Sequence, residues 1–462
     1  MNIKYKSRRN AMSKKTDDFF SDLEQRTLNR NSINPDLNLK YRPKRGLRNP
    51  DGTGVLAGLT QIGEVHGYVM DESEKTPVEG RLMYRGIDLR DIVAGFQADS
   101  RYGFEETCYL LLFGDLPNDK QHKEFKDLLN SYRGLPENFT EDMILKAPSP
   151  NIMNKLARTV LSLYSYDDEA EDRNLKNVIK QSIMLISRFP VLTAYAYHTK
   201  HHYYDNGTLH LRHIPEDLST AEVFLSLLRS DGNYTKLEAE ILDLALVLHA
   251  EHGGGNNSAF TVRAITSSDT DTYSAIAAGI GSLKGYKHGG ANIKVLQMVD
   301  NIKANVKNWS NETELEDYLA KIIRKEAFDG NGLIYGMGHA IYTYSDPRAI
   351  LLKEKAQLLA VEKGHEEELN LYYNIEKLTP GLFHEIKQND KIIAANVDMY
   401  SGFVYQMLDI PDDIYTPLFA MSRISGWCAH RIEEIISGGR IIRPAYKCVQ
   451  PKQQYVPIAE RQ

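Results

Sequence analysis

Three features are scarce in this sequence of 462 residues, and each scarcity excludes a class of protein. Its 3 cysteines, Cys108, Cys428 and Cys448, lie far apart and form no Cys-x-x-Cys pair. Neither a disulfide framework nor a zinc knuckle is indicated, and such cysteine use fits a reducing compartment, so we expect a cytoplasmic protein. Uninterrupted apolar runs of the roughly 18 residues that a membrane-spanning helix needs are also missing. We therefore expect no contact with a membrane.

Positive charge is not in excess in this sequence either. The chain has 56 Lys and Arg residues against 62 Asp and Glu residues, which gives a formal charge of -6. This balance argues against a general role in nucleic-acid binding. The first residues, MNIKYKSRRNAMSKK, are basic but lack the apolar stretch of a secretory signal. We interpret them as part of a solvated arm, with an organelle transit peptide as the alternative.

The sequence is rich in helical periodicity from Phe104 onward. In LEAEILDLALVLHAEH the apolar residues Leu237, Ile241, Leu244 and Leu248 are spaced by four, three and four positions, which places them on one helical stripe. Similar patterns in NVIKQSIMLISRF, TYSAIAAGIGSLKG and ILLKEKAQLLAVEKG predict a mainly α fold built from packed helices. Short strands are expected only between about 58 and 85, where QIGEVHGYVM and RLMYRG flank the turn cluster DESEKTPVEG.

Breaks in the pattern predict how the chain is divided. The polar first fifty residues end in the Pro- and Gly-rich RPKRGLRNPDGTG, so residues 1–57 are expected to form an N-terminal arm or a peripheral helix. Further breaks fall at GYKHGGAN and at KQNDK. We expect a large helical domain over residues 58–289 and 410–462, interrupted by a smaller helical domain over residues 290–409.

Several histidines lie where chemistry is possible. His249 and His252 are three residues apart at a helix end, and His252 continues the apolar stripe before three glycines that allow close backbone approach. This pair could in principle bind a metal, or it could simply pack or cap the helix. His288 lies between a helix stop and a helix start, where it could stabilise an oxyanion or merely belong to a turn. His339 follows the flexible Gly-Met-Gly.

Four charged residues also invite a functional interpretation. Arg348 follows Asp-Pro in the first turn of a predicted helix, an end that attracts anions, so something negative is expected there. Asp398 precedes an apolar helix, where a negative charge also suits the helix dipole. Arg423 lies in an apolar helix and, if buried, needs an anion. Arg443 precedes a proline and is expected in extended backbone.

Taken in order, these segments resemble the citrate synthase family. The similar stretches are LHAEHGGGNNSAFTVRAITSS, AAGIGSLKGYKHGGAN, GMGHAIYTYSDPRA, NVDMYSGFVYQMLDIP, FAMSRISGWCAH and RIIRPAY. Upstream, LMYRGIDLRDI and FEETCYLLLFGDLPN are also similar to the family. The resemblance covers residues from about 58 to 446 and leaves the N-terminal arm outside it. It implies the family's helical fold, with a large domain and a smaller inserted domain, and the condensation of acetyl-CoA with oxaloacetate to citrate and CoA.

The resemblance also implies roles for individual residues. Asp398 matches the base that removes a proton from the methyl group of acetyl-CoA, and His288 matches the donor to its thioester oxygen. His339 matches the group that polarises the oxaloacetate carbonyl. The remaining matches are oxaloacetate contacts, namely His252, Arg348, Arg423 and Arg443.

Arg443 matches an arginine that the family supplies across a dimer interface, so the resemblance implies a homodimer. Ser258 matches a residue that orients His288. Neither a metal nor a cofactor is implied, because acetyl-CoA is a substrate.

Two alternatives remain open at this stage. A 2-methylcitrate synthase uses the same residues with propionyl-CoA, and one extra methylene is discriminated by only about 1–3 kcal/mol of pocket fit. A protein of a different class would be a non-catalytic helical protein that binds metal through His249, His252, His288 and His339. Bound stoichiometric zinc without thiol release from acetyl-CoA and oxaloacetate would favour that class.

Overall fold

The structure is a computed structural model that describes residues 2–71, 74–388 and 392–461. The chain forms two compact units, Met1–Gly58 and Leu59–Gln462. The first unit contains helix α1 (Asn2–Asn31), helix α2 (Asp36–Tyr41) and a 3-10 turn at Arg45–Leu47. In α1, the side chains from residue 16 to residue 31 are exposed. The predicted arm thus contains a long helix, while the predicted boundaries of the two helical domains stay a prediction.

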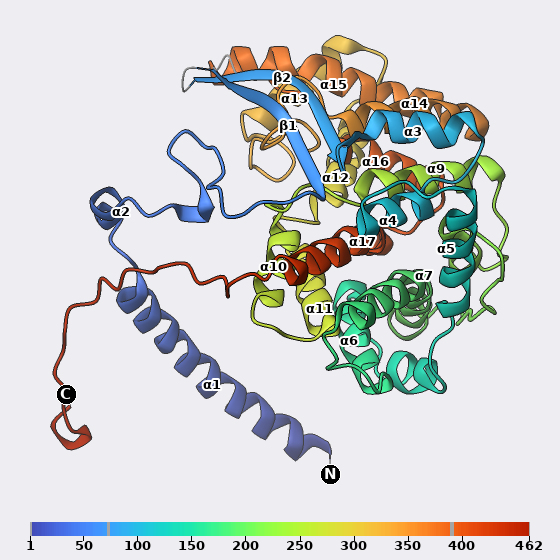
Figure 1. Ribbon diagram of the computed structural model, residues 1–462. Coiled ribbons are helices and arrows are strands. Elements are labelled where there is room, and N and C mark those ends of the chain that lie inside the picture. Colours follow the sequence, from blue (N-terminus) through green and yellow to red (C-terminus); the bar gives the residue numbers. More distant parts are fainter. Residues whose placement is uncertain (1, 72–73, 389–391, 462) are drawn as a thin grey trace. The chain divides into compact units, whose positions relative to one another are not determined.

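The second unit is mainly helical (Figure 1). Its longer helices are α3 (Leu89–Ala98), α4 (Phe104–Phe113), α5 (Asp119–Tyr132), α6 (Ile152–Leu163), α7 (Leu175–Asp205), α8 (Thr220–Leu228), α9 (Lys236–His249), α10 (Asn257–Thr266), α11 (Thr272–Leu283), α12 (Ala291–Asn305), α13 (Glu312–Ile323), α14 (Pro347–Lys363), α15 (Glu366–Lys387), α16 (Val397–Met407) and α17 (Tyr415–Ile436). The mainly α fold expected from the sequence is confirmed. None of the helices in the described ranges combines the length and apolar character that a bilayer span requires.

Within the described residues, the strands form one small antiparallel sheet of β1 (Gly63–Asp71), β2 (Glu74–Tyr84) and β3 (Ile87–Asp88). The expected strands are present, but the expected turn cluster is wrong in extent, because most of DESEKTPVEG belongs to β2. Pro77 pairs with Tyr68 next to an irregularity in β1, a position that tolerates a missing N–H. Gly80 in β2 is required for close approach, since a Cβ there would lie 2.0 Å from the Ser345 carbonyl oxygen.

Local capping fixes where two helices near the site begin. At α9, Thr235 Oγ1 accepts the Glu238 N–H at 3.2 Å while Glu238 Oε2 accepts the Thr235 N–H at 2.8 Å, a reciprocal capping box. At α14, Asp346 Oδ1 accepts the Arg348 N–H at 3.0 Å, and Pro347 occupies the first helical position. Arg348 therefore lies in the first turn of its helix, as the sequence predicted.

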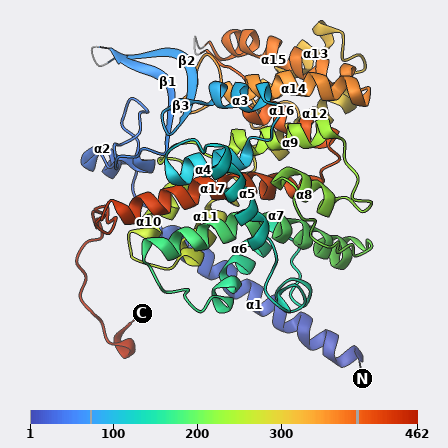
Figure 2. The same cartoon turned by 45° about the vertical axis from the view of Figure 1, so that its right-hand side comes forward.

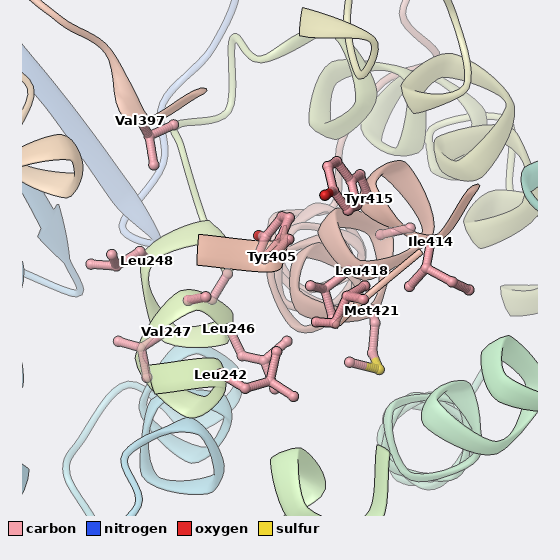
Figure 3. Close-up of a cluster of buried hydrophobic side chains, with 14 of the residues drawn as sticks. Leu242, Leu246, Val247, Leu248, Val397, Tyr405, Ile414, Tyr415, Leu418 and Met421 are labelled. Atoms are coloured by element: carbon pink, nitrogen blue, oxygen red, sulfur yellow. The ribbon is translucent and has the colours of Figure 1, made fainter. Parts of the chain in front are cut away.

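Helix α17 lies in the middle of the second unit, with α4 and α9 on one side and α6, α7, α10 and α11 on the other (Figures 1 and 2). Leu242 and Leu246 of α9 lie beside Leu418 and Met421 of α17 (Figure 3). Tyr405 of α16 joins this cluster. All of these side chains are buried. The core thus fixes α9, α16 and α17 against one another, and these helices carry or precede most of the predicted site residues.

Candidate active site

Arg348 is held at the start of α14 by its own cap. Its guanidinium donates from Nε to Asp346 Oδ1 at 3.0 Å and from Nη2 to Asp346 Oδ2 at 2.8 Å. Both side chains are buried. The pKa of Arg348 is raised because the adjacent Asp346 outweighs the effect of burial. The negative partner expected from the sequence is therefore supplied in part by Asp346, which fixes the cation in position.

The loop between α13 and α14 presents His339. Its Nδ1 accepts the N–H groups of Ile341 at 3.1 Å and Tyr342 at 3.2 Å. A backbone N–H can only donate, so Nδ1 carries no proton and the proton of the neutral ring lies on Nε2. Burial, followed by the nearby Arg348, lowers the pKa of His339 to about 4. At neutral pH, His339 is thus an uncharged imidazole whose Nε2–H is available to donate.

His252 faces His339 from the turn that follows α9. Their ring centroids lie 5.3 Å apart, and the Tyr342 ring lies 4.7 Å from His339 and 5.7 Å from His252. Burial, followed by Arg348, holds the pKa of His252 well below its usual range. His252 Nε2 is buried and has no hydrogen-bond partner among the described residues. A neutral imidazole with an unused nitrogen beside His339 is suited to contact a polar ligand.

His288 lies between α11 and α12 and is oriented by Ser258, the second residue of α10. His288 Nε2 lies 3.2 Å from Ser258 Oγ, which also accepts the indole N–H of Trp427 at 3.0 Å. The hydroxyl has a single proton and two acceptors in reach, His288 Nε2 and Asn256 Oδ1 at 2.9 Å. Burial, followed by Arg423, lowers the pKa of His288 to about 4, so this ring is also neutral at pH 7.

Asp398 lies in the first turn of α16, just after the cap residue Asn396. Burial raises the pKa of this carboxyl to about 6; Arg348 opposes the shift and Asp346 adds to it. Asp346 Oδ2 also accepts the Val397 N–H at 3.2 Å. One buried carboxylate therefore connects the start of α16 with Arg348 on α14. A carboxylate whose pKa lies near neutrality is poised for proton transfer.

Arg423 is fully buried in α17. Its Nε donates to the His249 carbonyl at 2.6 Å, and its guanidinium lies 4.7 Å from the centre of the Phe419 ring. Nη1 and Nη2 have no hydrogen-bond partner in the part of the chain that the structure describes. Burial lowers the pKa of Arg423 to about 10, which leaves it charged at pH 7. A buried cation with two unused donors is a ready contact for an anion.

Two of the candidate residues, His249 and Arg443, lie apart from the functional groups described above. His249 is buried against Phe419, with ring centroids 4.5 Å apart, which is the packing role considered for it. Arg443 is exposed in the C-terminal segment, where its neighbour Ile442 donates to Ser267 Oγ at 2.9 Å. Ser267 and Ser258 are at opposite ends of α10, about 14 Å apart along the helix. The structure does not bring Arg443 to His288 of its own chain.

Sequence reasoning missed two contributors. From the sequence, Asp346 was noted only as part of the Asp-Pro pair at a predicted helix start, although it also holds Arg348 and the start of α16. Tyr342 was not singled out, yet its buried ring contacts both His252 and His339 and lies 5.8 Å from the Arg348 guanidinium. Only the short spacing of Asp346 and Arg348 could have signalled their pairing.

In the described ranges, no group of three or more His, Cys, Asp or Glu side chains is arranged to hold a metal ion.

Comparison with known proteins gives one consistent result. The family model for the citrate synthase C-terminal domain matches residues 52–445. A citrate synthase from Synechocystis sp. is 31% identical over 88% of this chain and 92% of its own length. Citrate synthase 2 of Bacillus subtilis is 35% identical over 83% of this chain and 94% of its own length. A 2-methylcitrate synthase from Shewanella oneidensis is 32% identical over 82% and 92% of the two chains.

Solved structures show the same relationship. The citrate synthase of Pyrobaculum aerophilum superimposes with a TM-score of 0.72 at 26% identity, covering 90% of this chain and 95% of its own. The citrate synthase of Thermoplasma acidophilum, solved as a ternary complex with carboxymethyl coenzyme A and oxaloacetate, gives a TM-score of 0.73 at 25% identity. That match covers 91% of this chain and 99% of the other.

Proposed function

The chain belongs to the citrate synthase family, and from that premise we propose that it condenses acetyl-CoA with oxaloacetate and hydrolyses the resulting citryl-CoA to citrate and CoA. The chain is an enzyme of the citrate synthase type, an acyltransferase. The choice of substrates and the role of each residue belong to the proposal. The observation that supports it best is the grouping of two buried arginines, Arg348 and Arg423, with the neutral imidazoles His252 and His339.

Oxaloacetate carries two carboxylates and one keto group, and the site offers matching groups. Arg423 has two unused guanidinium nitrogens, and Arg348 is fixed in place by Asp346. We assign both arginines to the carboxylates. His339 donates from Nε2 to the keto oxygen and stabilises the negative charge that develops there when the keto carbon is attacked. His252 adds a second contact to the same substrate.

Activation of acetyl-CoA requires a base and a hydrogen-bond donor that act together, because the methyl protons of a thioester are only weakly acidic. Asp398 takes one of these protons, and its pKa of about 6 leaves it mostly ionised at pH 7. His288 donates from Nδ1 to the thioester oxygen as the enolate forms. That assignment needs Ser258 to give its proton to His288 Nε2, so that the ring keeps its own proton on Nδ1.

The later steps begin once Asp398 and His288 have formed the enolate. The enolate carbon forms a bond to the keto carbon of oxaloacetate, and the keto oxygen takes up a proton to give citryl-CoA. Water then cleaves the thioester, which releases citrate and the CoA thiol. A third arginine, Arg443, is exposed in the C-terminal segment and lies apart from His288 of its own chain. We propose that the partner's Arg443 completes the set of oxaloacetate contacts.

Condensation of propionyl-CoA with oxaloacetate is the second candidate function. It is supported by the 32% identity to a 2-methylcitrate synthase. Release of CoA thiol from acetyl-CoA and from propionyl-CoA, each with oxaloacetate, tests both candidates in one assay. A higher kcat/KM for acetyl-CoA supports the citrate synthase activity. A higher kcat/KM for propionyl-CoA reverses the assignment, and no thiol release from either overturns the proposed function.

A further inference from the structure

Glu251 is a fully buried carboxylate to which the mechanism above gives no role. Its Oε1 accepts the Gly253 N–H at 2.5 Å and faces His430 Nε2 at 3.0 Å. Its Oε2 is buried without a hydrogen-bond partner in the described part of the chain. Glu251 immediately precedes His252, so whatever fixes this carboxylate also fixes the turn that carries a proposed substrate contact.

The groups behind Glu251 determine its charge state. Arg263 donates to His430 Nδ1 from Nε at 3.1 Å and from Nη2 at 2.9 Å. A guanidinium can only donate, so His430 Nδ1 is unprotonated and Nε2–H donates to Glu251. Burial opposes the charge of Glu251, but the hydrogen bonds from His430 and Gly253 and the nearby charge of Arg423 lower its pKa on balance, so Glu251 is ionised. The charge of Arg263 is matched separately by Glu433 and by Glu434 at 2.9 Å, so it is not the counter-ion of Glu251.

One face of α17 places Glu251 close to Arg423. Gly426 follows Arg423 by three residues, about one helical turn, and His430 follows Gly426 by four. A Cβ at Gly426 would lie only 2.5 Å from Glu251 Oε2, so the unpaired oxygen lies against α17 one turn from Arg423. The Arg423 nitrogens Nη1 and Nη2 and the Glu251 oxygen Oε2 belong to groups of opposite charge. None of these three atoms has a hydrogen-bond partner among the described residues.

We propose that Glu251 is the counter-ion of Arg423 when no substrate is bound and thereby limits the affinity for oxaloacetate. The inference rests on the proposed function, because it takes oxaloacetate as the anion that Arg423 binds. A buried cation without a counter-ion destabilises the folded protein, and Glu251 relieves that cost. When a substrate carboxylate reaches Arg423, the same negative charge repels it. Glu251 thus acts on the substrate through Arg423 and is a positioning residue.

The test compares Glu251→Gln, which keeps the shape and removes the charge, with Glu251→Asp, which keeps the charge on a shorter side chain. The Kd of oxaloacetate is measured by calorimetry on the full-length protein, and KM and kcat by thiol release. We expect Glu251→Gln to bind oxaloacetate roughly three- to tenfold more tightly, with an unchanged KM for acetyl-CoA and a lower Tm without ligand. We expect Glu251→Asp to show no such tightening.

A role limited to packing predicts a lower Tm with equal or weaker oxaloacetate binding in both variants, and that result overturns the proposal. If Glu251→Gln does not fold, His430→Phe provides the second test. Loss of the Nε2–H donor lets the Glu251 carboxylate turn toward Arg423 and compete with substrate, so oxaloacetate binding should weaken by about threefold or more. Unchanged or tighter binding in His430→Phe counts against the proposal.

Measurements on the wild-type protein distinguish a failure of the proposed function from a failure of the counter-ion role of Glu251. If it neither binds oxaloacetate nor releases CoA thiol, the proposed function fails. If it does both while Glu251→Gln shows no gain in oxaloacetate affinity, only the counter-ion role of Glu251 fails.

Discussion

Asp346 and Arg348 form a two-point ion pair that belongs to a single helix start. Arg348 donates from Nε and Nη2 to the two oxygens of Asp346, which also accept the backbone N–H groups of Arg348 and Val397. Val397 begins α16 and precedes Asp398. A single buried carboxylate therefore sets the relative position of a cation that we assign to oxaloacetate and a base that we assign to acetyl-CoA. Proximity of that kind can account for a large part of a catalytic rate.

Replacing Asp398 with Asn tests the base. The amide keeps the shape but cannot take a proton, so we expect kcat to fall by about 10²- to 10⁴-fold while the Kd of oxaloacetate stays within about twofold. Thiol release and calorimetry measure the two quantities. The exposed Asp317→Asn serves as a matched control with unchanged kcat. Wild-type turnover in Asp398→Asn contradicts the assignment.

The pH dependence should report the same group. Burial raises the pKa of Asp398 to about 6, and the base must be ionised, so activity is present above that pH and is lost as the pH falls through it. His288 and His339, whose pKa values are lowered to about 4, remain neutral over this range. We expect kcat/KM for acetyl-CoA to fall about tenfold per pH unit well below pH 6. A profile that is flat from pH 7 down to pH 5 is the contrary result.

Arg348→Leu tests the selectivity of the arginine for oxaloacetate. Loss of a buried, charge-assisted contact should raise the KM of oxaloacetate by about 10²-fold or more, with a much smaller change in the KM of acetyl-CoA. The variant also leaves Asp346 buried and unpaired, so its Tm should be measured alongside. The exposed Arg324→Leu is the control. Equal increases in both KM values argue against a specific contact with oxaloacetate.

Mixing two inactive variants tests whether the partner's Arg443 is used. Arg443→Ala and Asp398→Asn should each lose most activity as pure proteins. In a hybrid dimer, one of the two sites combines an intact Asp398 with an intact Arg443 from the other subunit, so part of the activity should return. Thiol release is followed after subunit exchange, which mass spectrometry verifies. Demonstrated exchange without recovered activity excludes this sharing of the site.

Ser258→Ala tests the proton that we place on His288. Without the hydroxyl, Nε2 loses its donor, and the indole N–H of Trp427 loses its acceptor. We expect kcat to fall by about tenfold or more while oxaloacetate binding is retained. Ser258→Thr keeps the hydroxyl and should recover part of the rate. A Ser258→Ala variant with wild-type kcat removes the basis for the Nδ1–H assignment.

The helices and their ends could be predicted because local sequence dictates them. The stripe of Leu237, Ile241, Leu244 and Leu248 predicted α9, and Asp346 with Pro347 predicted the start of α14. The extent of β2 was not predictable from turn propensity alone, since pairing with β1 keeps Pro77 in a strand. Tertiary contacts, rather than local preference, decided that segment.

The sequence by itself determined which chemical groups are present and at which helix ends they lie, because capping, periodicity and glycine placement act over a few residues. Only the tertiary structure decided the charge and proton positions of those groups. The neutral state of His339, the raised pKa of Asp398 and the lowered pKa of Arg423 all depend on burial and on neighbours. Such neighbours come from segments far apart in the chain, as His430 and Glu251 do, and no local pattern records that Glu251 Oε2 lies against Gly426, one helical turn from Arg423.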